Sequence, residues 1–230
     1  MDPLITWAIQ DHRPGIRVWR RPGAVAVACS ALARRDRIAV SGEPAAVADL
    51  LAGEVLPATG PDHRPFGDED LVAAVAERLP ELTMAGTFGW MDTAVHVRAT
   101  RPYPVAWLPG DDGVRELLDA AFPASYARPG GDGVHRWAGV TGAGGLLAVA
   151  AEAWSSSRIG FLGGVATAPD ARGRGLASAV CAFVTGELLP GRERVALFVD
   201  HDNTVAIRTY EKLGFTLRRL GVAHRVPVRR

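Results

Sequence analysis

The sequence predicts a mixed α/β protein of the α+β class, organised as two lobes, and three observations lead to this prediction. Segments rich in Val, Ile and Ala alternate with segments whose apolar residues recur at a helical period. The chain has 230 residues, 48% of them hydrophobic, which suits one large domain or two compact lobes. Arg101-Pro102-Tyr103-Pro104 interrupts this pattern. We therefore expect an α/β lobe over residues 1–103 and a second domain over residues 104–230.

The first lobe has a strand–strand–helix–helix–strand pattern. The expected elements are strands at Ala24–Ala33 and Arg37–Val40, helices at Pro44–Leu56 and Asp68–Leu79, a loop over 57–67 and a strand at Phe88–Val97. Val, Ile and Ala dominate the first two strands, and the first helix begins at Pro44, a residue type that is favoured at a helix start.

The second domain begins with a short strand and contains one strand, Arg158–Thr167, that is apolar on both faces. A strand of that kind is buried on both sides. The other expected elements are strands at Val105–Leu108, Arg136–Val140, Leu146–Ala153 and Arg194–Val199, helices at Asp111–Phe122, from the Gly/Arg loop to about Leu188 and at Asn203–Leu213, a hairpin turn at Thr141–Gly145 and a strand pair around Phe215–Val228.

A glycine-rich segment, Arg172-Gly173-Arg174-Gly175-Leu176-Ala177, connects the buried strand to the next helix. The first turn of a helix leaves backbone N–H groups unpaired and carries the positive end of the dipole. Glycine lets an anion approach these groups, and the two arginines add positive charge. By itself this pattern also fits a flexible turn before an amphipathic helix. Neither a Walker loop nor a Rossmann fingerprint is present.

A second motif follows about thirty residues later, with Asn203, Ala206, Tyr210, Gly214 and Phe215 spaced as Asn-x-x-Ala-x-x-x-Tyr-x-x-x-Gly-Phe. The two motifs together resemble those of the GNAT acyltransferase superfamily, over roughly Pro104 to Val228. This resemblance implies a GNAT fold: a mixed sheet with splayed central parallel strands, flanked by helices. It also implies an N-acetyltransferase that takes acetyl-CoA as acyl donor and a small-molecule or protein amine as acceptor.

The resemblance assigns the cofactor site residue by residue. The pyrophosphate is expected on the N–H groups of the glycine-rich segment, and the pantetheine arm between Arg158–Thr167 and Arg194–Val199. Asn203 is expected to contact that arm, or to cap the following helix. The expected cofactor residues are Val165, Ala166, Thr167, Arg172, Gly173, Arg174, Gly175, Leu176, Ala177, Asn203, Ala206 and Tyr210.

Tyr210 is the expected catalytic acid, because a leaving thiolate needs a proton that a nearby hydroxyl can supply. Packing against Ala206 and Leu213 on the same helix face is the alternative role. Glu152 is the first candidate for a general base. Asp200, His201 and His135 are weaker candidates, and a water chain could replace a single base. Trp137 and Trp154 are candidates for the acceptor pocket, with packing as the alternative.

Charge and cysteine content limit the other functional classes. A formal net charge of +1 gives no indication of nucleic acid or of an anionic membrane as partner. Two isolated cysteines and the lack of a signal-peptide pattern favour a reducing, cytoplasmic location, and no Cys or His pair has the spacing of metal ligands. The first lobe resembles a degenerate GNAT-like half without the glycine-rich loop, with a role in shaping the acceptor site or in homodimerisation. A catalytically silent acyl-CoA sensor or interaction module is the alternative to an enzyme.

Overall fold

The computed structural model describes residues 1–95 and 103–226, which form two compact units. Unit 1 comprises Met1–Trp90 together with Arg218–Arg230, and unit 2 comprises Met91–Leu217. We expected the boundary between the two parts after residue 103, but in the structure it lies between Trp90 and Met91. The C-terminal segment from Arg218 onward belongs to the first unit, which we did not expect.

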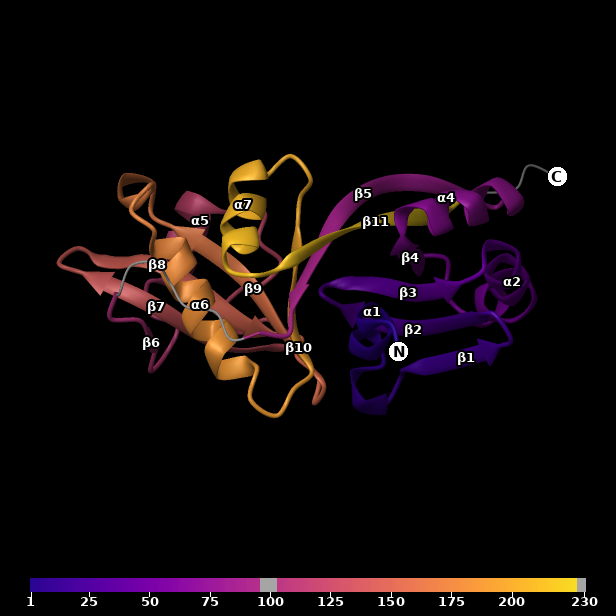
Figure 1. Ribbon diagram of the computed structural model, residues 1–230, viewed down its shortest axis with the longest axis horizontal. Coiled ribbons are helices and arrows are strands. Elements are labelled where there is room, and N and C mark those ends of the chain that lie inside the picture. The colour runs from indigo at the N-terminus through magenta and orange to yellow at the C-terminus, as the bar shows by residue number, and fades with distance from the viewer. Residues whose placement is uncertain (96–102, 227–230) are drawn as a thin grey trace. The chain divides into compact units, whose positions relative to one another are not determined.

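Unit 1 is a sheet with strand order β1-β2-β3-β4-β11-β5, covered by helices (Figure 1). Strands β3 and β4 pair in parallel, and β11 pairs with β4 in antiparallel orientation. The apolar core lies between the sheet and helices α2 and α4. The elements are α1 (Pro3–Ala8), β1 (Arg17–Arg21), β2 (Ala24–Leu32), β3 (Arg35–Gly42), α2 (Pro44–Leu50), α3 (Leu56–Ala58), β4 (Arg64–Asp68), α4 (Glu69–Arg78), β5 (Leu82–Thr93) and β11 (Thr216–Arg225).

Several expectations for this unit were wrong in detail. Helix α1 and strand β1 were not expected, and β4 occupies part of the segment that we expected to be a loop. The helix expected over Pro44–Leu56 is α2 followed by a π-helical turn at Leu51–Val55 and by α3. Strand β5 begins six residues earlier than expected, and residues 96 and 97 of the expected strand lie outside the described residues.

Unit 2 contains a sheet with strand order β5-β10-β9-β8-β7-β6, to which β5 contributes residues 91–93. Strands β7, β8 and β9 pair in antiparallel orientation, whereas β9 and β10 are parallel. The elements are β6 (Ala106–Trp107), α5 (Val114–Ala121), β7 (Val134–Gly142), β8 (Gly145–Ala153), β9 (Ile159–Thr167), a 3-10 turn (Pro169–Ala171), α6 (Leu176–Leu188), β10 (Arg194–Val199) and α7 (Thr204–Lys212).

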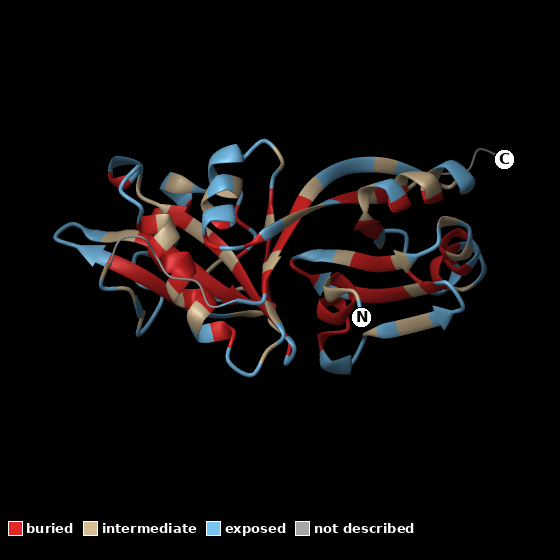
Figure 2. Cartoon of the chain, viewed as in Figure 1, coloured by how far each residue is buried: buried red, intermediate tan, exposed pale blue. Residues whose placement is uncertain are grey.

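Helix α6 lies across one face of this sheet, and α7 packs beside it (Figure 1). Val180, Val184 and Leu188 of α6 are fully buried and belong to the same core as Leu197 of β10 and Tyr210 of α7. Figure 2 shows buried residues in red along the strands and along α6. The mixed sheet flanked by helices confirms the expected fold class. The last expected strand pair is instead one strand, β11, within the described residues.

In residues 1–95 and 103–226, each helix is too short or too polar to cross a membrane.

Candidate functional site

The parallel strands β9 and β10 pair only at their N-terminal ends. Arg194, Val195 and Ala196 pair with Ile159, Gly160 and Phe161, and beyond this point no further register is formed although both strands continue. The backbone N–H and C=O groups that face the opening need other partners. An extended ligand that carries amide groups can supply them by adding itself between the strands. The expected splay of the two strands is therefore present.

A bulge in β9 lies beside this opening. On β8 the register advances from Ala151 to Val149, two residues, while on β9 it advances from Gly163 to Ala166, three residues. Gly164 lies in the bulge with a φ of +61°, and a Cβ there would come within 2.6 Å of the Trp137 ring. Glycine is thus required by both conformation and space. The sequence analysis missed this position, although two adjacent glycines inside a strand are the signal of a bulge.

The glycine-rich segment leads directly into α6. Gly173 and Gly175 have φ values of +74° and +87°, and Gly175 is the N-cap residue. The first backbone bond into the helix runs from the Ala179 N–H to the Gly175 carbonyl, so the N–H groups of residues 176–178 precede the helical ladder. A Cβ at Gly173 would meet no atom within 4 Å, so the space beside the segment is open. These features are the ones by which helix N-termini bind anions, and the binding of a pyrophosphate here stays a prediction.

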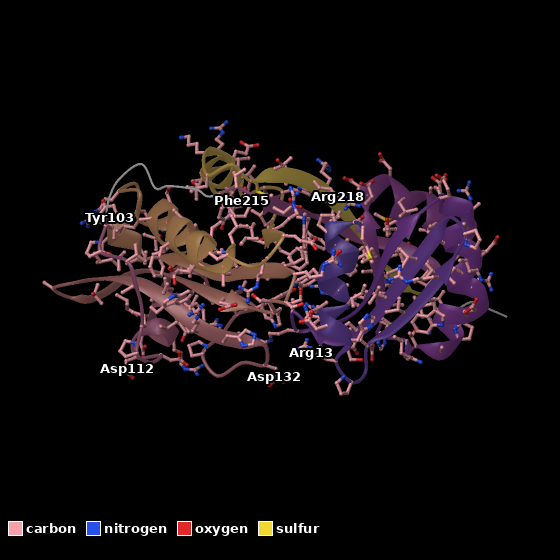
Figure 3. All side chains as sticks on the ribbon, turned by 60° about the horizontal axis from the view of Figure 1, so that its bottom comes forward. Arg13, Tyr103, Asp112, Asp132, Phe215 and Arg218 are labelled. Atoms are coloured by element: carbon pink, nitrogen blue, oxygen red, sulfur yellow. The ribbon has the colours of Figure 1, made fainter. Side chains whose placement is uncertain are left out.

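Two contacts hold this segment in place. The Tyr103 hydroxyl donates a hydrogen bond of 2.8 Å to the Arg174 carbonyl oxygen, and Figure 3 labels this tyrosine. The Arg172 guanidinium donates to the carbonyl oxygen of Ala121 at the end of α5, over 3.3 Å. Because the Arg174 carbonyl oxygen accepts the hydrogen bond from Tyr103, it does not point toward an anion beside the loop. This contact could not be expected from the sequence, because Tyr103 precedes Arg174 by 71 residues.

Asn203 is the N-cap of α7. Its side-chain Oδ1 accepts a hydrogen bond from the Ala206 N–H at 3.1 Å, which is the capping role weighed in the sequence analysis. The cap fixes the first turn of α7, and the same helix carries Tyr210 two turns later. The contact of Asn203 with a pantetheine arm stays a prediction.

Tyr210 lies at the end of α7 and is 7% exposed. Its ring centroid is 6.0 Å from that of Phe215, the last residue of the motif. Burial, with a smaller electrostatic effect of Cys181, raises the pKa of Tyr210 well above its ordinary value of 10.0. The hydroxyl group therefore keeps its proton at neutral pH. Its catalytic role stays a prediction.

Some buried polar atoms of unit 2 have no partner. Among the described residues, five side-chain N or O atoms are buried without a hydrogen bond, and four of them belong to unit 2. They are Trp137 Nε1 on β7, Thr167 Oγ1 at the end of β9, Thr185 Oγ1 on α6 and His201 Nε2 in the loop after β10. Thr167 and His201 follow the parts of β9 and β10 that do not pair with each other.

Glu152 has both carboxylate oxygens engaged. Arg136 Nε lies 2.9 Å from Oε2, and Arg192 Nη2 lies 3.1 Å from Oε1. Glu152 is 6% exposed. Arg192, which contacts Glu152, also donates a hydrogen bond to the carbonyl oxygen of Leu188, so this arginine links Glu152 to the C-terminal end of α6. A carboxylate whose two oxygens are both held by guanidinium groups can bridge the secondary-structure elements that carry them. A general base needs a carboxylate oxygen that can accept a proton from the substrate, and both oxygens of Glu152 are already engaged.

The other residues that we considered for a general base or for the acceptor pocket differ in their exposure. Asp200 and His135 are exposed, and Trp137 and Trp154 are buried on the sheet face opposite α6. The Trp154 indole N–H donates to the Asp132 carbonyl at 3.0 Å, so this side chain has a structural role. No group of three or more His, Cys, Asp or Glu side chains suited to a metal ion occurs in the described part of the chain.

Part of the sequence is similar to a known protein family and to a curated protein. The sequence model of the FR47-like protein family matches residues 140–224. A mycothiol acetyltransferase of Corynebacterium jeikeium (strain K411) is 39% identical over 72 residues, which are 31% of this chain and 21% of that protein. The chain thus matches only about a fifth of the length of this curated relative.

Solved structures share the fold. A GCN5-related N-acetyltransferase from Kribbella flavida aligns with a TM-score of 0.65 and 16% identity, over 100% of this chain and 97% of that chain. A GCN5-related N-acetyltransferase from Sphaerobacter thermophilus aligns with a TM-score of 0.56 and 17% identity, over 90% and 78%. The chain has the GNAT fold, and the resemblance to this superfamily that its motifs predicted is confirmed.

Proposed function

We propose that this GNAT-fold chain is an acyl-CoA-dependent N-acyltransferase that moves an acetyl group from acetyl-CoA to a primary amine. The observation that carries the proposal is the opening between β9 and β10 beside the glycine-rich N-terminus of α6. An anion site and an unpaired strand edge lie next to each other there. Coenzyme A has both matching parts, a pyrophosphate and an extended arm with two amides.

Binding follows from these groups. The N–H groups of residues 172–177 would hold the pyrophosphate, and the main chain near Val165 and Thr167 would pair with the amides of the arm. In unit 1 the corresponding connection from β3 to α2 is the single residue Glu43. An acidic residue in so short a connection leaves no room for a phosphate cradle. We therefore propose that unit 1 binds no CoA.

The chemistry then requires one acid and one proton acceptor. The amine nitrogen attacks the thioester carbonyl carbon, the C–S bond breaks, and the thiolate takes the proton of the Tyr210 hydroxyl. The nitrogen loses its extra proton as the amide forms, and water returns a proton to the tyrosine. Because Glu152 is engaged by Arg136 and Arg192, we propose that water accepts the amine proton and that Glu152 bridges β8 to the end of α6.

An assay with a panel of amines tests this proposal. The protein is incubated with acetyl-CoA and amino acids, aminoglycosides, polyamines or peptides, and both free thiol and acetylated amine are measured. We expect one equivalent of CoA for each acetylated amine, and much less product with the Gly175→Asp variant at the same acetyl-CoA concentration. Binding of acetyl-CoA without transfer to any amine class would instead identify a sensor. A protein that binds neither acetyl-CoA nor CoA would contradict the proposal altogether.

A further inference from the structure

Two phenylalanine rings meet across the closed end of the opening between β9 and β10. Phe161 of β9 belongs to the last pair that the two strands form, opposite Ala196 of β10. Phe198 lies two residues beyond Ala196, so its side chain is on the same face of the sheet as that of Phe161. The two ring centroids are 5.1 Å apart at an interplanar angle of 68°. On this face, the rings therefore span the opening where strand pairing ends.

Two leucines take the corresponding place on the other face of the sheet. Leu162 follows Phe161 on β9, and Leu197 follows Ala196 on β10. Each leucine is 1% exposed, and both belong to the apolar core that includes α6. The closed end of the opening thus has apolar side chains on both faces, and such surroundings favour the apolar end of a ligand.

Trp154 holds the ring of Phe161 from the side away from β10. The ring centroids of Trp154 and Phe161 are 6.2 Å apart, and the Trp154 indole N–H donates to the Asp132 carbonyl oxygen at 3.0 Å. Trp154 and Phe161 are 5% and 1% exposed, whereas Phe198 is only partly buried. Close-packed side chains do not make room for added volume without a cost in free energy. Phe161 is therefore held in place, and Phe198 can be replaced with the smaller loss to the core.

The proposed function determines which part of the acyl donor reaches these rings. The glycine-rich segment follows the carboxyl end of β9, and the two strands pair at their N-terminal ends. An arm that starts from a pyrophosphate at this segment therefore runs toward the paired ends. The thioester is at the end of that arm, and the acyl carbons lie beyond it. The acyl chain thus extends toward Phe161 and Phe198.

We infer that the ring pair of Phe161 and Phe198 limits the acyl donor to short chains, and that Phe198 is a specificity-determining residue. This inference rests on the proposed function. The acetyl group has only a methyl group beyond its carbonyl carbon, which can contact the two rings without moving them. A hexanoyl group carries further carbons in line, and these would have to displace a ring of the pair. Displacing a packed ring is unfavourable, so the donor class is acetyl-CoA and not a medium-chain acyl-CoA.

Calorimetric titration with CoA, acetyl-CoA and hexanoyl-CoA tests this inference without an amine acceptor. We expect the wild type to bind CoA and acetyl-CoA with similar affinity, and hexanoyl-CoA about tenfold more weakly because of the overpacking. Phe198→Ala removes the ring and leaves room for the longer chain, whose burial increases affinity about fourfold for each CH₂. The ratio of hexanoyl-CoA affinity to CoA affinity should therefore rise at least about tenfold in this variant.

Two further variants separate specificity from stability. Phe183→Ala is the matched control, because Phe183 is also a partly buried phenylalanine of unit 2, and its ring contacts Trp107 on β6 at 5.5 Å between centroids. This variant should keep the wild-type ratio. Phe198→Leu removes less volume than Phe198→Ala and should give an intermediate ratio, which provides the test if the alanine variant does not fold.

Each contrary outcome has a distinct meaning. If the wild type binds hexanoyl-CoA as tightly as acetyl-CoA, the inference is wrong and the proposed function stands. The same conclusion follows if folded Phe198 variants bind CoA without a higher ratio, or if Phe183→Ala raises the ratio equally. If the wild type binds none of the three ligands, the proposed function fails, and the inference fails with it.

Discussion

The hydroxyl group of Tyr103 donates a hydrogen bond of 2.8 Å to the carbonyl oxygen of Arg174, in the middle of the glycine-rich segment before α6. This contact ties a residue near the start of unit 2 to the loop that we propose for the pyrophosphate. It holds one carbonyl dipole of the loop in a fixed direction. Because an anion is repelled by carbonyl oxygens and attracted by N–H groups, that direction matters for binding.

Replacing Tyr103 by phenylalanine removes this hydrogen bond and keeps the ring. A hydrogen bond of this kind contributes a net of about 0.5–1.5 kcal/mol, so CoA affinity should fall about 2- to 10-fold. Calorimetric titration with CoA measures the effect. Tyr210→Phe is the matched control and should bind CoA as tightly as the wild type. Unchanged affinity in Tyr103→Phe would show that the loop holds its conformation without this contact.

Replacing Gly175 by aspartate should remove the anion site. The φ of +87° strains any residue with a Cβ, and the new carboxylate repels the pyrophosphate at the helix N-terminus. CoA affinity should fall by more than about tenfold, equivalent to about 1.4 kcal/mol. Gly144→Asp is the control, because it adds the same charge in the open turn between β7 and β8. A folded Gly175→Asp protein with wild-type affinity would mean that CoA binds elsewhere.

Replacing Tyr210 by phenylalanine removes one hydroxyl and keeps the ring that packs near Phe215. If the hydroxyl protonates the thiolate, the rate of the chemical step should fall by roughly 10²–10⁴-fold. Because the pKa of Tyr210 is raised by burial, the wild-type rate should show no loss from tyrosine ionisation up to about pH 10. Single-turnover measurements avoid masking by product release. A full rate in this variant would assign the tyrosine to packing.

The buried cysteines should make the protein less stable in alkali. Burial raises the pKa of Cys181 from 9.0 to about 12 and that of Cys29 from 9.0 to about 11. Above about pH 9 the unfolded thiols lose protons that the folded thiols keep, so the free energy of unfolding falls as pH rises. Urea unfolding between pH 7 and 10.5 should show this decline. In Cys29→Ala/Cys181→Ala it should be shallower, and equal slopes in both proteins would refute the account.

The elements around the proposed site could be predicted because each carries its own local signal. Glycine residues precede α6, and Asn203 precedes α7, so both helix starts follow from capping chemistry. The apolar residues on both faces of β9 indicated a buried strand. The residues that act across the fold, Tyr103 on Arg174 and Trp137 on Gly164, have no local pattern, since their partners are distant in sequence.

Strand β4 shows why part of unit 1 could not be predicted. Pro65 and Gly67 within Arg64–Asp68 are typical of a loop. In the structure the segment pairs with β3 on one side and with β11 on the other, so tertiary pairing overrides the local preference. A Cβ at Gly67 would come within 2.5 Å of the Val40 carbonyl oxygen, which explains the glycine by close packing. The pairing with β11 joins residues about 150 positions apart, which no short pattern predicts.

The structure of the protein with bound CoA tests the central claim most directly. We predict that the pyrophosphate contacts the N–H groups of residues 172–177 and that the arm lies between β9 and β10, with its amides paired to the main chain near Val165 and Thr167. The Tyr210 hydroxyl should then lie within hydrogen-bond distance of the CoA sulfur. CoA bound outside the opening between β9 and β10, or with its sulfur far from Tyr210, would contradict this account.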